Sequence, residues 1–238
     1  MKANAEGEMP DWPVPSTWRS ALDLNNEGVT LYGNNVSPPC RKIKTIFKFY
    51  GIKYTQLSSK PDSEYKKIPI VTIGKYQIND SHIIARILAQ VLEGNDLTER
   101  ELLIEQTTTR GLMMALEVSV MESIHAIQQC APHISENLCL QGLVWSVACC
   151  IPCCGLSNRI KSKFPDLKSV PSYGKWYAEQ LGDQPFFHGE TIGIIDCAVY
   201  GVLGGFAVAG NLCFDEFVGA DVRLKSWWQK CTVQVDQK

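Results

Sequence analysis

The chain has 238 residues, of which 45% are hydrophobic and 20% are charged, and its formal net charge is −2. This length allows one large domain or two small ones, and the composition excludes a wholly disordered chain. Because no long basic run is present, we expect no nucleic-acid partner. The first 28 residues hold acids and prolines without an apolar run, so a secretory signal is not expected there.

Residues 1–28 are interpreted as a weakly structured N-terminal arm. Three apolar side chains of this arm, Trp12, Trp18 and Leu22, are able to pack on the domain that follows. The sequence therefore predicts a weakly structured arm that lies on the domain behind it.

Residues 29–95 show strand and helix signals in a mixed order. Alternation predicts a strand at 29–33, and an apolar stripe predicts a helix from Pro38 to Tyr50. Further strands are predicted at 52–57, at 70–74 and at 76–79. A second helix is predicted to begin at Asp80 or Ser81 and to end at Gly94. The first strand, helix and second strand indicate a parallel pair with a right-handed crossover.

Beyond residue 96 the pattern is helical and contains no convincing strand. The chain is therefore predicted to hold an α/β domain over 29–95 and an all-helical domain over 96–238. The predicted helices of the second domain cover about 99–128, 137–163, 168–182, 194–210 and 221–232.

The segment 138–157 carries no charge and contains four of the ten cysteines, Cys149, Cys150, Cys153 and Cys154. Its glycines and polar residues favour a buried helix of a globular domain, kinked or ended at a proline, over a membrane span. A zinc site and a peripheral membrane contact through acylated cysteines are the open alternatives. Since the histidines show no ligand spacing either, we expect no metal.

Three short segments of the first domain carry the candidate chemistry. Ser37 stands at the start of a helix just after a strand, where the helix dipole favours an anion. A cis bond at Ile68-Pro69 would leave the Ile68 backbone free to pair with an extended peptide. Asp80 and Ser81 offer a carboxylate, a hydroxyl and backbone N–H groups at another helix start. Each feature alone is a weak signal, and helix capping by itself also explains Ser37 and Asp80-Ser81.

The blocks VTLY…SPPCRKIKTIFKFYGIKY, KKIPIVTIGKYQINDSHIIARIL and PFFHGETIGIIDCAVYGVL resemble the glutathione transferase superfamily. Within it, they are most similar to the microsomal prostaglandin E synthase type 2 family. The likeness covers roughly residues 29–233. It implies a thioredoxin-like domain followed by a helical glutathione-transferase domain, glutathione as the cofactor, a homodimer and a cytoplasmic protein.

The resemblance also implies roles for individual residues. Pro69 would be the cis proline, with Ile68 giving backbone bonds to the cysteinyl part of glutathione. Asp80 and Ser81 would bind its γ-glutamyl end. Asp196 would match the structural aspartate of the superfamily's helix-capping motif, although the position three residues earlier is a glycine.

Two positions depart from the prostaglandin synthase pattern. Ser37 and Cys40 stand where that family has a CxxC motif, and Asn34 replaces a tyrosine. A dithiol cycle needs two thiols, so thiol–disulfide exchange is not expected. Several transferase classes use a serine here to stabilise the glutathione thiolate, and Ser37 fits that role. Tyr32 is a weaker candidate for it, and Cys40 is either a buried thiol or a reactive one.

The sequence thus predicts a glutathione-dependent transferase or isomerase that acts on a hydrophobic small molecule. One alternative is a prostaglandin E synthase-type isomerase that binds haem with glutathione. Another is a non-catalytic member of the fold that binds a hydrophobic ligand or a protein. The residues that these hypotheses single out are the catalytic candidates Ser37, Cys40 and Tyr32 and the glutathione-binding candidates Ile68, Pro69, Asp80 and Ser81.

Overall fold

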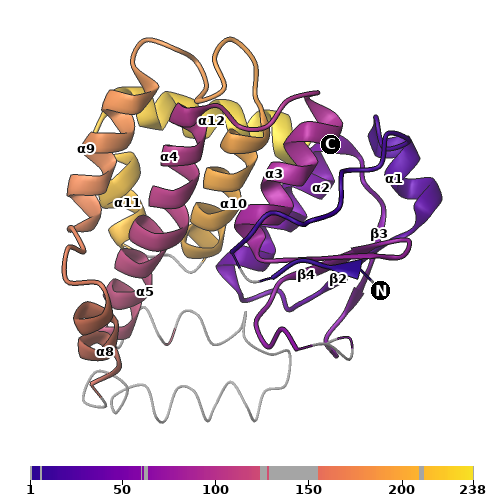
Figure 1. Ribbon diagram of the computed structural model, residues 1–238. Coiled ribbons are helices and arrows are strands. Elements are labelled where there is room, and N and C mark those ends of the chain that lie inside the picture. The colour runs from indigo at the N-terminus through magenta and orange to yellow at the C-terminus, as the bar shows by residue number, and fades with distance from the viewer. Residues whose placement is uncertain are drawn as a thin grey trace.

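The computed structural model describes residues 2–5, 7–59, 61, 64–123, 128, 155–208 and 212–237. A sheet with its helices forms one half of this structure, and helices alone form the other half (Figure 1). The expected order of an α/β part followed by an all-helical part is therefore observed.

The sheet has five strands in the order β1-β5-β4-β2-β3. Strands β2 and β3 pair in parallel, as the predicted crossover requires, whereas β4 is antiparallel to both β2 and β5. The N-terminal strand β1 joins the edge of the sheet parallel to β5. The strands are β1 (Lys2–Ala3), β2 (Val29–Tyr32), β3 (Tyr54–Leu57), β4 (Ile70–Ile73) and β5 (Tyr76–Asn79).

Helices α2 (Pro38–Tyr50) and α3 (Ser81–Leu92) lie between the sheet and the helical half (Figure 1). Alternation along a strand turns every second side chain toward these helices. Burying this apolar face removes it from water, which is the main favourable term in folding. The buried set includes Val29, Leu31, Val71, Ile73 and Ile78 of the sheet, Ile43, Ile46 and Phe47 of α2, and Ile84 and Leu88 of α3.

In the helical half, the helix predicted over 99–128 is interrupted by a π-helical turn. Within the predicted helix 137–163, the structure describes only 155–163, so the four clustered cysteines lie outside the described residues. Helix α11 was not predicted. The elements are α4 (Glu99–Thr107), η1 (Thr108–Leu112), α5 (Met113–Met121), α8 (Leu156–Lys163), α9 (Val170–Leu181), α10 (Ile194–Val208), α11 (Leu212–Val218) and α12 (Val222–Asp236).

The two halves meet where α10 packs closely against α2. A Cβ atom placed on Gly201 of α10 would lie 2.8 Å from the Cα atom of Lys42 and 3.0 Å from the carbonyl oxygen of Arg41. A side chain at position 201 would therefore push the two helices apart. Glycine at this position permits the short distance between the helix backbones.

Asp196 holds the start of α10 in place. Its buried carboxylate accepts hydrogen bonds from the backbone N–H groups of Phe187, His188 and Gly193 and from Nε1 of Trp227. The neighbouring Gly193 offers no side chain for the cap, so the backbone and an indole supply the donors. Asp196 is therefore structural.

The N-terminal arm is more structured than the sequence predicts. It contributes β1 and helix α1 (Ala21–Glu27), which is capped by Ser20. Trp12 and Trp18 are buried against each other and against Tyr76. The expectation that Leu22 would also pack is wrong, because this side chain is 66% exposed.

None of the helices formed by the described residues has the length and apolar character needed to cross a bilayer. Nor do His, Cys, Asp or Glu side chains of this part of the chain gather in groups of three or more that could bind a metal ion.

Candidate functional site

The sheet register brings the three candidate segments to one edge. Ile70 pairs with Tyr32 on one side and with Asn79 on the other, so these residues form a row across β2, β4 and β5. Ile68 and Pro69 directly precede this row, and Asp80 directly follows it. The loop from β2 to α2 leaves from the same row. Segments that are far apart in sequence thus meet because β4 runs antiparallel to its neighbours.

The Ile68-Pro69 peptide bond is cis, as predicted. Pro69 is buried at the start of β4, and Ile68 is half-buried. Since a proline lacks an N–H group, it is tolerated at the first position before a strand. The backbone of Ile68 therefore lies outside the β4 ladder, at the edge described above.

Asp80 is the N-cap of α3, and its carboxylate accepts a hydrogen bond of 2.9 Å from the His82 backbone N–H. Its φ angle is +73°, and among the described residues it alone combines a positive φ with a side chain larger than that of glycine. The next residue, Ser81, is 4% exposed. No hydrogen bond to the Ser81 hydroxyl is found within the described part of the chain.

Asn79, directly before Asp80, is held by the N-terminal arm. The Asn79 side chain donates a 2.7 Å hydrogen bond to the carbonyl oxygen of Asn4, and the Asn4 side chain accepts one of 2.7 Å from the Asn79 backbone. Gln77 also donates to the Asn79 side chain. The arm therefore fixes the end of β5 from which Asp80 extends.

Ser37 is the N-cap residue of α2, but its hydroxyl makes no capping hydrogen bond to the helix. A neighbouring side chain orders the loop just before the helix. The Asn34 side-chain oxygen accepts hydrogen bonds from the N–H groups of Val36, at 3.1 Å, and Ser37, at 2.7 Å. The next two positions are prolines without N–H groups. The free backbone donors expected at this helix start are thus largely absent, while the Ser37 hydroxyl is not used as a cap.

Cys40 lies inside the domain, with no exposed surface. A Cβ atom placed on Gly33 would lie 2.5 Å from the Cys40 sulfur, so the thiol packs against the backbone that leaves β2. Burial raises the pKa of the Cys40 thiol, although hydrogen bonds with the Ser37 hydroxyl and the Asn34 N–H act in the opposite direction. At neutral pH this thiol is protonated, which disfavours attack on an electrophile.

Tyr32 lies in β2, one residue beyond Leu31. Because Leu31 is fully buried on the face that meets the helices, alternation puts Tyr32 on the opposite face of the sheet. Cys40 packs against Gly33, on the helix side. Tyr32 is half-buried and is therefore separated by the sheet from the thiol of Cys40.

A buried ionic cluster joins α2, α3 and α4 and was not predicted. The Lys42 ammonium and the Glu105 carboxylate are 2.5 Å apart, and both side chains are inaccessible to water. The His82 ring also contacts Glu105, and Thr109 donates to this carboxylate at 2.9 Å. Burial acts to raise the pKa of Glu105, but the Lys42 charge and the His82 contact outweigh it and set the pKa at about 2.

The signal for this cluster was present in the sequence. Lys42 precedes Ile46 by four residues, which puts a charged side chain on the apolar stripe of α2. A lysine in such a position needs a partner when it is buried. No pattern in the sequence indicated that His82 would contact this carboxylate.

No protein-family model and no curated protein sequence matches the chain. Solved structures do match. An apo mutant of human glutathione-S-transferase T1-1 has a TM-score of 0.54 at 14% identity, covering 88% of this chain and 85% of that chain. A glutathione S-transferase of Ceriporiopsis subvermispora, in complex with glutathione, has a TM-score of 0.51 at 13% identity, covering 89% and 99%. One from Pseudomonas fluorescens has 0.50 at 16%, covering 85% and 93%.

These matches extend over both halves of the chain and confirm the predicted fold. The protein has the glutathione transferase fold, with a thioredoxin-like domain followed by a helical domain. Identities this low establish the fold and leave the reaction open. The finer likeness to the prostaglandin E synthase type 2 family is not shown by them.

Proposed function

We propose that the protein binds glutathione at the sheet edge where Ser37, Ile68 and Asp80 meet. The row from Tyr32 to Asn79 crosses two strand spacings, which is roughly 10 Å. An extended tripeptide has about the same length. In this arrangement the Ile68 backbone pairs with the cysteinyl residue, beside Pro69. Asp80 and Ser81 then hold the γ-glutamyl end, where a carboxylate and a hydroxyl suit an ammonium and a carboxylate.

The backbone of Asp80 is the observation that carries this proposal. A non-glycine residue at φ +73° stores strain of about 1–3 kcal/mol, and such residues cluster at ligand sites. Capping alone does not require it, since an N-cap residue normally has extended backbone angles. The strained turn aims the Asp80 carboxylate and the unpartnered Ser81 hydroxyl along the same edge as Ile68.

Ser37 is the residue that we propose as the thiolate stabiliser. The Asn34 side chain accepts a hydrogen bond from the Ser37 N–H, and the Ser37 hydroxyl makes no capping hydrogen bond to α2. A hydroxyl that donates to the glutathione sulfur lowers the pKa of that thiol and raises the thiolate fraction at neutral pH. The nucleophile would then attack a hydrophobic electrophile in a transfer or isomerisation. Cys40 supports the loop from within, and Tyr32 lines the other sheet face.

Two alternative functions are also proposed. The prostaglandin E synthase-type isomerase with bound haem would need other groups at Asn34 and Ser37, where the structure has a loop-capping amide and a hydroxyl. The non-catalytic binding protein is favoured by one observation, the scarcity of free N–H groups at the start of α2. The homodimer, the cytoplasmic location and the peripheral membrane contact stay proposals as well.

The binding proposal is tested with Asp80→Asn. This change keeps an oxygen that accepts the His82 N–H and removes the charge that would meet the glutathione ammonium. Losing a charged partner costs about 1–3 kcal/mol, so glutathione affinity in calorimetry should fall about 5- to 150-fold. The exposed Asp11→Asn in the N-terminal arm is the matched control. Equal glutathione affinity in the parent and Asp80→Asn would refute this site.

The catalytic part is tested with Ser37→Ala and the pH dependence of conjugation to a generic electrophile. The parent should have a rate that rises through a pKa below the ordinary thiol value of about 8.5. In Ser37→Ala this pKa should return toward that value while glutathione affinity changes little. Parent-like rates for Ser37→Ala at pH 6.5 would remove Ser37 as the thiolate stabiliser. A parent rate no higher than that of the reaction without protein would support the non-catalytic alternative.

A further inference from the structure

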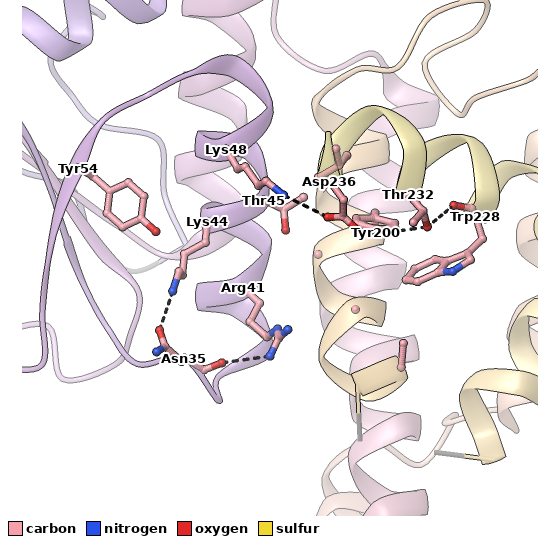
Figure 2. A pocket seen from close by; sticks show the side chains of 14 residues that line it. Asn35, Arg41, Lys44, Thr45, Lys48, Tyr54, Tyr200, Trp228, Thr232 and Asp236 are labelled. Carbon is pink, nitrogen blue, oxygen red and sulfur yellow. Dashed lines mark hydrogen bonds and ion pairs between the residues drawn. The ribbon is translucent and has the colours of Figure 1, made fainter. Parts of the chain in front are cut away.

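A cavity of about 860 Å³ opens between α2 and the pair α10 and α12, apart from the candidate residues discussed above (Figure 2). Figure 2 shows Arg41 and Lys48 on the side of α2 nearer α10 and α12, whereas Lys44 extends toward Asn35. The cavity has a cationic wall on α2 and an aromatic wall on the opposite helices. Neither wall is used by the proposed glutathione site.

The cationic wall consists of Arg41, Lys44 and Lys48, which follow one face of α2 at helical spacing. Only Lys48 has a counter-charge, because its ammonium lies 3.3 Å from the carboxylate of Asp236 on α12. Arg41 and Lys44 are half-buried, and within the described part of the chain no carboxylate pairs with either of them.

The contacts of Arg41 and Lys44 are neutral oxygen atoms. Lys44 donates to the side chains of Asn35, at 2.6 Å, and Gln56, at 3.1 Å, while Arg41 reaches the Asn35 carbonyl at 3.5 Å. Burial lowers the pKa of Arg41, and burial together with the nearby Arg41 charge lowers the pKa of Lys44. Two adjacent cations that lose water without gaining an anion are costly unless a ligand supplies the charge.

The opposite wall is apolar. The rings of Tyr200 and Trp228 lie with their centroids 4.4 Å apart, and Phe214 packs on Trp228 at 4.8 Å. Between this wall and α2, the floor is formed by small residues of α10. A Cβ atom at Gly204 would meet no atom within 4 Å, so the cavity reaches the helix backbone there. An elongated apolar group therefore has space to lie along α10.

We propose that this cavity binds an amphiphilic anion, a carboxylate with an aliphatic chain, as a second ligand beside glutathione. The carboxylate bridges Arg41 and Lys44, whose guanidinium and ammonium groups present several donors. The chain lies over Gly204 against Tyr200 and Trp228. A cationic amphiphile is disfavoured by the same two charges, and a polyanion would leave the aromatic wall uncovered. The Lys48–Asp236 pair links α2 to α12 at the far side.

Decanoate, below its micellar concentration and without glutathione, is the probe for isothermal titration calorimetry. It should bind to the parent protein, and octanoate, which is two methylenes shorter, should bind about 15-fold more weakly, since each buried methylene is worth roughly fourfold in affinity. Decyltrimethylammonium should not bind. Failure of decanoate to bind, or equal binding of the cationic analogue, would overturn the proposal.

Two variants locate the site. Arg41→Gln with Lys44→Gln removes both charges and should weaken decanoate at least 30-fold, whereas the exposed Lys225→Gln on α12 should change it less than twofold. Gly204→Leu places a side chain in the cavity at a position where a Cβ atom meets no atom within 4 Å, and it should abolish binding while the melting temperature is kept. Parent-like affinity in either cavity variant would place decanoate elsewhere and reject the site.

Testing each variant with the ligand of the other site distinguishes the decanoate site from the glutathione site. Asp80→Asn should leave decanoate affinity unchanged, and the Gly204→Leu protein should keep its glutathione affinity. Competition between decanoate and glutathione for one site would contradict a second ligand. Loss of glutathione binding alone would leave the decanoate result standing.

Discussion

Neighbouring cations of helix α2 differ in their burial and in their partners. Lys42 faces the junction with α3 and α4, where it is fully buried and paired with Glu105. Arg41 and Lys44 face the cavity beside α10 and α12, where they are half-buried and have only amide and carbonyl oxygens as partners. The three cations lie on the same helix, and both regions contact the helical half. Their different environments therefore come from the groups that each cation meets and not from its position in the chain.

The presence or absence of a carboxylate partner decides whether a cation of α2 is neutralised within the protein. A buried cation with a fixed carboxylate is neutralised within the protein. The resulting ion pair connects the two domains. A half-buried cation without a carboxylate partner is left with an uncompensated charge, and an anionic ligand can compensate it. We therefore expect the first region to contribute to stability, and the second is the region for which we propose ligand binding.

The largest expected effect comes from breaking the buried pair. Glu105→Gln leaves the Lys42 charge uncompensated, and we expect a loss of about 3–5 kcal/mol in the free energy of unfolding. The double change Glu105→Leu with Lys42→Met removes both charges and should recover most of that loss. Urea unfolding measures both, with the exposed Glu99→Gln on α4 as the control. A double variant as unstable as Glu105→Gln would show that the cluster does more than neutralise charge.

A change in pH should weaken the same cluster without a mutation. The pKa of Glu105 is about 2 in the folded protein and 4.5 by reference, so its stabilising contribution is complete above pH 4.5. It is lost as the pH falls toward 2, because the unfolded chain then binds the proton more readily. Between pH 5.5 and pH 3 the parent should lose about 2 kcal/mol more than the double variant without the two charges does. Parallel curves would speak against a charged Glu105.

The smallest effect is expected at the exposed pair of the cavity. The side chains of Lys48 and Asp236 are 44% and 54% exposed, so Lys48→Gln should cost less than about 1 kcal/mol. The same change should alter decanoate affinity less than about threefold, because Asp236 already offsets the Lys48 charge. A larger loss of decanoate affinity would move the anion from Arg41 and Lys44 toward Lys48.

Much of the thioredoxin-like half follows from local patterns. The strands at 29–32 and 70–73 and the helix at 38–50 lie within a residue or two of their predicted bounds, because apolar periodicity and turn residues act over a few positions. The cis bond at Pro69 and the cap at Asp80 were also predicted. Where local signals are short the prediction was incomplete, as at the seven-residue helix α11.

Tertiary structure decided the contacts between segments that are distant in the sequence. Glu105 is 63 residues from Lys42, and no pattern in either segment identifies the other as its partner. The unusual lysine on the apolar stripe could be seen, but its neutralisation could not. Likewise, Ser37 makes no capping hydrogen bond to α2, while the Asn34 side chain accepts hydrogen bonds from two N–H groups of the loop before the helix. Periodicity reports which face of an element is buried, whereas pairing across elements depends on how those faces are brought together in space.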